Sequence, residues 1–300
     1  MLSGIGPSRR GFLFGTGAFA LASASFPATG RAASSGRIVA LDWVSGMNLL
    51  ALGIAPVAMP ELEHYTRLVV EPTLPQTTIE LGLRSEPNLE LIDSLKPSLI
   101  VRNTDAPLAG TGLSSIAPVH IFDDRFSATT SPLEAGRTAM ATLAAQLRVE
   151  GRFQMAEKSF SDAVTEARKL LGNYDGRPLV ITTVIDGRRL LIFGKNSLFQ
   201  NALDLLGIEN AWDGYTSHYG HTTVAADQLV AYAQARLLCV GDTSRDRLNM
   251  LLAAPVMKSL PFVRQRRIVR IPDVLFYGGL PPAHRFIRLA ATALSQEPSL

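Results

Sequence analysis

One long helical pattern divides this chain into two stretches of another kind. The segment 132–171 is mainly helical, and apolar residues recur along its second half at helical spacing: Phe153, Ala156, Phe160, Ala163, Val164, Ala167, Leu170 and Leu171. About 22 residues with a rise of 1.5 Å each make a helix of roughly 33 Å. A packed helix of that length holds two lobes at a nearly fixed separation, which a Gly/Ser linker does not. The alternative is an ordinary covering helix within one larger domain.

The stretches on both sides of this helix alternate short β-branched or leucine-rich runs with helical patterns, as in α/β units around mostly parallel sheets. Before the helix we predict strands at 37–43, 56–59, 78–82, 98–101 and 119–122, and helices at 44–53 and 88–95. After it we predict strands at 178–185, 189–193, 237–240 and 268–271, and helices at 197–206, 245–260 and 282–295. The strands 178–185 and 189–193 are placed to pair through the turn at Asp186-Gly187.

The N-terminus has the features of an export signal. Arg9 and Arg10 precede an apolar, Ala/Gly-rich stretch, and no acidic residue occurs before Asp42. This arrangement predicts export by the twin-arginine route, with an ordinary Sec signal or a disordered basic terminus as the alternatives. The apolar run is too short to span a bilayer, and no cysteine follows it to carry a lipid. We therefore expect a periplasmic protein without a membrane anchor.

These patterns predict four segments. They are a signal peptide at 1–33, an N-terminal α/β lobe at 34–148, a connecting helix at 149–172 and a C-terminal α/β lobe at 173–300. The three arginines of the signal account for the net charge of +3, so the mature chain is close to neutral. It has no basic tail or Lys/Arg run that could neutralise a row of phosphates, which argues against a nucleic-acid partner. The single cysteine, Cys239, lies in an apolar run and is expected to be a buried small hydrophobe rather than a catalytic thiol.

Six collinear segments resemble the periplasmic ferric-hydroxamate (ferrichrome-type) siderophore-binding proteins of ABC importers. They are RIVALDW at 37–43, LLALGI at 49–54, GLRSEPNLEL at 82–91, FGKNSLFQ at 193–200, GIENAW at 207–212 and PFVR at 261–264. The resemblance implies two α/β lobes with mostly parallel or mixed sheets, joined by one long rigid α-helix, with the ligand in the cleft between them. It also implies a monomer that is not an enzyme and that delivers an iron chelate to an inner-membrane ABC permease.

The ends of the first-lobe strands supply candidate ligand-binding residues: Trp43, Arg84, Arg102 and Asn103. Ligands in α/β folds bind beyond the carboxyl ends of strands. A ferric hydroxamate presents a rim of oxygens around a saturated metal, so the protein needs a rigid cation and apolar walls rather than metal ligands. Iron(III) is then bound only through the siderophore, with no cofactor of the protein's own. The resemblance places the family's hydroxamate-binding arginine at Arg84; the alternative is a surface arginine that pairs with Glu86.

The second lobe contributes a loop at 212–221 that is rich in aromatic residues and histidines. Tyr215 lies in this loop, Tyr219 stands where the family has a pocket tryptophan, and His221 stands where it has a polar contact. Trp212 is expected to belong to the core. His218 and His221 have a zinc-like spacing, but no third ligand accompanies them, so we predict no metal site. Tyr277 and its neighbours form a further expected edge of the cleft.

Four positions depart from the family pattern: Leu68, Arg102, Ala106 and Leu275 stand where the family presents large aromatics. We therefore expect a wider and less aromatic pocket. If Arg102 lies beside Arg84, two cations favour an anionic ligand, such as a citrate or other carboxylate-containing dihydroxamate. The alternative is that Arg102 points to solvent.

Family members dock to the permease through one acidic residue on each lobe. Asp227 matches this pattern on the second lobe, whereas the first-lobe position is Thr111, so Glu61 or Glu63 is a candidate substitute. Two other functions remain as alternatives. One is a binding protein of the same architecture for haem, cobalamin or another metal chelate, and the more distant one is an exported α/β hydrolase. The chain contains no Gly-x-Ser-x-Gly, Walker or Gly-x-Gly-x-x-Gly motif.

Overall fold

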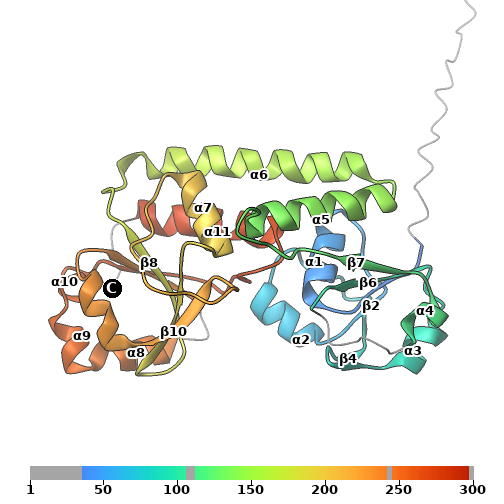
Figure 1. Ribbon diagram of the computed structural model, residues 1–300, viewed down its shortest axis with the longest axis horizontal. Helices are drawn as coiled ribbons and strands as arrows, with labels where there is room; N and C mark the ends of the chain where they lie inside the picture. The colour runs from blue at the N-terminus through green and yellow to red at the C-terminus, as the bar shows by residue number, and fades with distance from the viewer. Residues whose placement is uncertain (1–35, 106–111, 242–244, 297–300) are drawn as a thin grey trace, which may run out of the picture. The chain divides into compact units, whose positions relative to one another are not determined.

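Two five-stranded sheets carry the fold, one from each predicted α/β block (Figure 1). The computed structural model describes residues 36–105, 112–241 and 245–296, so the predicted signal peptide lies outside the described residues. The first sheet is wholly parallel, in the order β3 (Ile79–Glu80), β2 (Ala58–Met59), β1 (Ile38–Ala40), β6 (Leu99–Asn103) and β7 (Val119–Phe122). The second is mixed, in the order β10 (His221–Ala225), β9 (Arg189–Phe193), β8 (Leu179–Val184), β11 (Arg236–Val240) and β12 (Ile268–Ile271).

Helices fill the connections between these strands. In the first lobe they are α1 (Trp43–Ala51), α2 (Leu62–His64), the π-helix η1 (Tyr65–Val69), α3 (Leu89–Ser94) and α4 (Leu113–Ile116). In the second lobe they are α7 (Leu198–Leu206), η3 (Ala226–Tyr232), α8 (Arg245–Ala253), α9 (Pro255–Ser259), α10 (Pro261–Arg264) and α11 (Leu280–Ser295). The turn at 186–187 does join β8 to β9 as an antiparallel pair, as predicted.

Two local predictions are wrong. The expected single helix at 245–260 is two helices, because Pro255 has no N–H to donate to the preceding turn. The loop at 212–221 ends in a strand that sequence analysis missed: His221 begins β10, which pairs with β9. A short hairpin of β4 (Gly82–Leu83) and β5 (Glu86–Pro87) was also missed, and it carries Arg84 in its two-residue turn.

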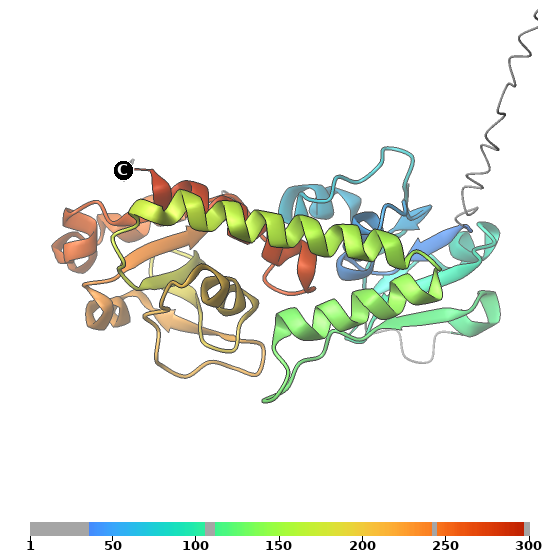
Figure 2. The same ribbon diagram turned by 90° about the horizontal axis from the view of Figure 1, so that it is seen from above.

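The long helix is α6 (Glu150–Leu170), which continues into the short 3₁₀ turn η2 (Leu171–Asn173). It packs against α5 (Pro132–Gln146) and also against α7 and α11, which come from the second lobe (Figures 1 and 2). One continuous apolar core lies under these helices. It takes alternate residues from both sheets, for example Val101 of β6 and Ile181 of β8. The prediction of two α/β lobes joined by one long helix is therefore confirmed.

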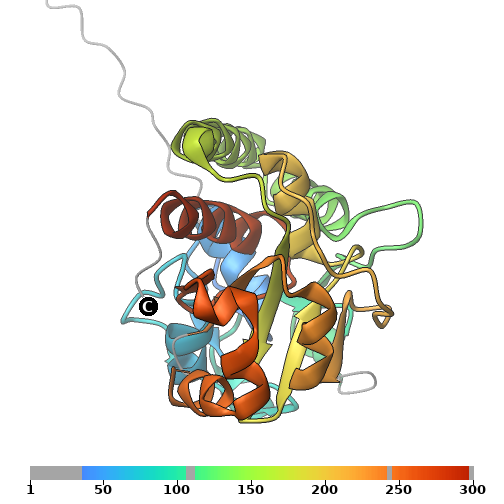
Figure 3. The same cartoon turned by 90° about the vertical axis from the view of Figure 1, so that its left-hand side faces the viewer.

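The opposite faces of the sheets have separate cores. Val180 and Cys239 belong to the core that also contains residues of α8 to α10, whereas their neighbours in sequence belong to the core that contains residues of α7 and α11. This alternation is the period of two expected for strands. Figure 3 looks onto the second lobe, with α7 and α11 above α8 to α10. Cys239 is fully buried as predicted, and burial raises the pKa of its thiol to about 12. In the described ranges, no helix combines the length and apolar character that crossing a membrane requires.

Candidate functional site

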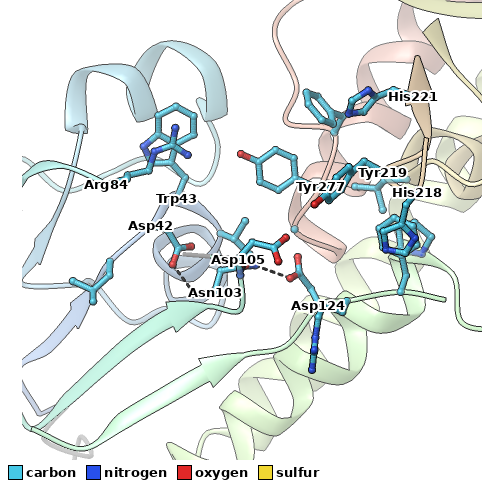
Figure 4. Close-up of a pocket in the computed structure, with 18 of the residues that line it drawn as sticks. Asp42, Trp43, Arg84, Asn103, Asp105, Asp124, His218, Tyr219, His221 and Tyr277 are labelled. Atoms are coloured by element: carbon cyan, nitrogen blue, oxygen red, sulfur yellow. Dashed lines mark hydrogen bonds between the residues drawn. The ribbon is translucent and has the colours of Figure 1, made fainter. Parts of the chain in front are cut away.

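A cavity of about 520 Å³ lies where β1, β6 and β7 end, and residues of both lobes line it (Figure 4). In open α/β sheets this edge is where ligands bind. The first lobe contributes the loops that follow the three strands and the turn of the β4–β5 hairpin. The second lobe contributes the start of β10, the loop before it and the segment between β12 and α11. The sequence predicted a cleft between the two lobes, with contributions from the ends of first-lobe strands and from the 212–221 loop and Tyr277 of the second lobe.

One end of the cavity is built around a fixed guanidinium group. Arg84 Nε lies 2.8 Å from Glu61 Oε2, and the guanidinium carbon lies 3.7 Å from the centre of the Trp43 ring. The partner of Arg84 is thus Glu61, not Glu86 as the alternative proposed. Trp43 is only 6% exposed and forms the first turn of α1, so it gives the stacked cation a rigid base. A cation held flat in this way presents its edge to a ligand.

The side chain of Glu80 holds the backbone at this end of the cavity in place. Its carboxylate accepts hydrogen bonds from the N–H groups of Glu61, Leu62 and Gly82, which fixes the start of α2 relative to the hairpin. Glu61 itself adopts a left-handed conformation, with φ of 54°. Its carboxylate pairs with Arg84 and lies in the cavity wall.

The polar wall below Arg84 is acidic. Asp42 caps α1 and accepts hydrogen bonds from the backbone N–H of Ser45 at 2.8 Å and of Asn103 at 2.6 Å. The Asn103 side chain donates to Asp124 Oδ1 at 2.6 Å and accepts from the Asp105 N–H at 2.7 Å. Asn103 therefore organises three aspartates along one wall.

Burial raises the pKa of two carboxyl groups on this wall. It raises the pKa of Asp42, and the hydrogen bonds to that carboxylate oppose the shift. It raises the pKa of Asp124 to about 6; the hydrogen bond from Asn103 opposes the shift, and the charges of Asp42 and Asp105 add to it. Asp124 is half-buried and next to like charges, so its ionised form is costly.

We expect Asp124→Asn to be more stable than the wild type at pH 7.5, by about 1–2 kcal/mol. Because the folded-state pKa lies above the ordinary value of 3.8, the ionised carboxyl costs stability at neutral pH. That cost declines progressively as the pH falls from about 6, where the folded protein takes up the proton, toward 3.8, where the unfolded chain does so as well. Thermal melts of both proteins between pH 4.5 and 8 measure the difference. An advantage that grows on acidification would contradict the assignment.

The second lobe supplies the aromatic wall. Tyr277 points its hydroxyl toward Arg84 (Figure 4); burial raises the pKa of that hydroxyl, and the charge of Arg84 partly offsets the rise. Tyr219 is 59% exposed at the cavity edge, and burial lowers the pKa of His221 nearby. His218 stacks on Phe126 of the first lobe, with ring centres 5.0 Å apart. This pair joins the two walls.

The structure brings most of the predicted residues together. Those that line the cavity are Trp43, Arg84, Asn103, Tyr219, His221 and Tyr277. Trp212 is buried against Tyr232, as predicted for a core residue. In the described ranges, no three His, Cys, Asp or Glu side chains are grouped so that they could hold a metal ion.

Other predicted residues lie elsewhere. Arg102 is not among the lining residues, because side chains alternate along β6 and its neighbour Asn103 takes the cavity side; Arg102 is in register with the exposed Ile121. Tyr215 is 80% exposed and Leu275 is buried in the main core, and neither lines the cavity. Leu68 packs against the same core. Ala106 and Thr111 lie outside the described residues.

Sequence analysis missed the acidic residues and the loop that follows β7. Asp42, Asp105 and Asp124 line the cavity, as do Arg125 and Phe126. The strand-end argument that selected Trp43 and Asn103 applies equally to the residues after 119–122, a strand that was predicted correctly. Applied there, it would have found Asp124 and Phe126.

Known proteins match this chain along most of its length. The periplasmic binding protein family matches residues 38–275. The iron(3+)-hydroxamate-binding protein FhuD of Escherichia coli (strain K12) is 38% identical over 258 residues, which are 86% of each chain.

Solved structures agree with the fold. The Fe³⁺–Desferal-bound siderophore binding protein FhuD of Vibrio cholerae has a TM-score of 0.79 and 26% identity, over 87% of this chain and 98% of its own. The petrobactin-binding protein YclQ of Bacillus subtilis has a TM-score of 0.68 over 87% and 93% of the two chains, and at 16% identity it supports the fold alone. From the arrangement of its lobes, its long helix and these matches, the chain belongs to the family of periplasmic binding proteins.

Proposed function

We propose that this protein binds a ferric hydroxamate siderophore in the cavity between its lobes and delivers it to an inner-membrane ABC permease. The observation that carries the proposal is Arg84, held flat on Trp43 by Glu61 at the mouth of an aromatic-lined cavity. The position is the one at which the family resemblance places the hydroxamate-binding arginine. The 38% identity to an iron(3+)-hydroxamate-binding protein supports the same ligand class.

The chemistry of the cavity suits a saturated iron chelate. Arg84 and Tyr277 can donate hydrogen bonds to the hydroxamate oxygens, while Trp43, Tyr219 and Phe276 contact the aliphatic linkers. The oxygens of the siderophore complete the coordination of iron(III), so the protein adds no ligand and no cofactor. It catalyses no reaction on the chelate; it holds and releases it.

The expectation of an anionic citrate-type ligand loses its support. It rested on Arg102 beside Arg84, and Arg102 is not on the cavity wall. The residues that do lie there include Asp105 and Asp124. The wall therefore meets an anionic ligand with like charges rather than opposite ones.

Delivery requires contact with a permease. Asp227, on η3, is exposed and fits the family's acidic contact on the second lobe. Of the two first-lobe candidates, Glu61 is tied to Arg84 and Glu63 is exposed, so Glu63 is the one we propose. Export by the twin-arginine route, a periplasmic location and a monomeric state remain our predictions.

Tryptophan fluorescence tests the proposed function. The chain has two tryptophans, of which Trp43 lines the cavity and Trp212 is buried in the second lobe. We expect ferric hydroxamates to quench the fluorescence in a saturable manner. Trp212→Phe should keep most of this quenching, and Trp43→Phe should lose most of it, because quenching falls steeply with distance from the chelate.

Haem, cobalamin and a ferric catecholate serve as comparison ligands in the same titration. Saturable quenching by the hydroxamates but not by these three is the expected result. A Soret band in protein mixed with haem, together with no response to ferric hydroxamates, would replace this proposal with a haem-binding one.

A further inference from the structure

The charges on the cavity wall do not balance. Arg84 is neutralised by Glu61, and Arg125 forms a two-pronged ion pair with Asp123, which is not one of the lining residues. The remaining charged groups of the wall are aspartates. The cavity therefore has an excess of negative charge once its internal pairs are counted.

This excess is concentrated at Asp105 and Asp124. The buried Asp42 is well satisfied, since Ser45 and Asn103 donate to it. Within the described ranges, neither Asp105 nor Asp124 forms an ion pair, and Arg125, whose charge interacts with that of Asp105, is itself paired with Asp123. Asp124 is half-buried, and the charge of Asp105 disfavours its ionised form. Figure 4 shows both carboxylates at the cavity beside Asn103, which is hydrogen-bonded to both residues.

A second and independent feature of the same cavity also points to a ligand. Trp43 lines the cavity and is more than nine-tenths buried, and its indole N–H has no hydrogen-bond partner among the described residues. A buried donor without an acceptor is costly. Among the described residues, the cavity wall thus contains a buried indole N–H without an acceptor and two carboxylates without an ion-pair partner.

We propose that Asp105 and Asp124 make the cavity selective for ferric hydroxamates that carry a protonated amine, over neutral and carboxylated ones. The inference rests on the proposed function and specifies its ligand class. Hydroxamate oxygens meet the Arg84 and Trp43 end, and an ammonium on the chelate's side chain meets the two carboxylates. A carboxylated chelate is disfavoured because it would bring like charges together.

The test compares two chelates that have the same iron centre and differ in one positive charge. Ferric desferrioxamine B carries a single primary ammonium, and its N-acetyl derivative has the same iron centre without that charge. We expect the wild type to bind the ammonium form about five- to tenfold more tightly at low salt, the range of a partly exposed ion pair. Calorimetric titration of both complexes measures the ratio.

Asp105→Asn/Asp124→Asn should reduce this ratio to about one, and a thermal melt of the variant shows that it is folded. The amide at position 124 can still accept the hydrogen bond from Asn103. Asp162→Asn, on the exposed face of α6, removes one carboxylate that does not line the cavity and should keep the wild-type ratio.

The possible failures are distinguishable. Equal affinity of the wild type for the two complexes overturns the charge preference and leaves the proposed function intact. A preference that persists in the double variant overturns the assignment to Asp105 and Asp124. Binding of neither complex removes the proposed function, and this inference with it.

Discussion

Replacing Arg84 with alanine is expected to weaken binding of ferric hydroxamates about 100-fold, the size of a central interface residue that donates charged hydrogen bonds. The substitution has two effects. It removes the donors that face the hydroxamate oxygens, and it leaves Glu61, whose side chain is only 16% exposed, without its cation inside the cavity. An unpaired carboxylate near the oxygens of the chelate repels them. Calorimetric titration with the N-acetyl derivative of ferric desferrioxamine B measures the effect without the contribution of an ammonium.

Two further variants serve as controls. One separates the contribution of the shape of the Arg84 side chain from that of its charge, and the other measures the effect of removing any arginine from this lobe. Arg84→Lys keeps the charge but loses the flat stack on Trp43 and the fork of donors, so we expect about a tenfold loss of affinity. Arg67→Ala removes an exposed arginine of the same lobe and should bind like the wild type. Because the Glu61 side chain is only 16% exposed and loses its cation, Arg84→Ala should also lower thermal stability modestly. Wild-type affinity in Arg84→Ala would exclude it from the binding site.

The architecture could be predicted because it depends on local periodicity. The stripe along 150–171 and the strand runs 119–122, 189–193 and 268–271 appear in the structure within a residue or two of their predicted bounds. Side-chain direction at the cavity was harder to predict. Arg102 and Asn103 are adjacent and both end the same strand, yet only Asn103 reaches the cavity. Which of the two residues reaches the cavity depends on which face of the sheet α1 and α5 cover. A strand that is buried on both faces has no alternating pattern in its sequence that would reveal this face.

The electrostatics of the site could not be read from the sequence because its partners are distant along the chain. Glu61 meets Arg84 only because Glu80 fixes the start of α2 against the β4–β5 hairpin. Asp124 interacts with Asp42 only because β1, β6 and β7 are neighbours in one parallel sheet. The sequence suggested that two arginines, Arg84 and Arg102, lie at the site. In the structure three aspartates line the cavity and Arg102 does not. The hydroxamate ligand class does not depend on this difference, whereas the argument for an anionic ligand loses its basis because Arg102 does not line the cavity.

A backbone contact behind the cavity, also hidden in the sequence, gives the largest expected effect on stability. Gly136 lies within α5 and packs directly on Gly279, at the start of α11, so that a Cβ on Gly136 would lie 2.3 Å from Gly279 Cα and 2.9 Å from its nitrogen. Gly279 has φ of 82° and ψ of −129°, a conformation that side chains avoid. Neither backbone can move away cheaply, because α5 and α11 are both packed in the main core.

We therefore expect Gly136→Ala to lower the free energy of unfolding by about 2–3 kcal/mol and the melting temperature by roughly 5–10 °C. It should also weaken ligand binding, since the displaced segment carries Tyr277 at the cavity. Gly151→Ala is the matched control: it too is a helical glycine, but a Cβ there meets nothing within 4 Å, so its stability should be unchanged or higher by up to about 1 kcal/mol. Similar melting temperatures for the two variants would mean that α5 and α11 can separate without cost. The position of Tyr277 would then not depend on the glycine contact, and the cavity would be less rigid than its packing implies.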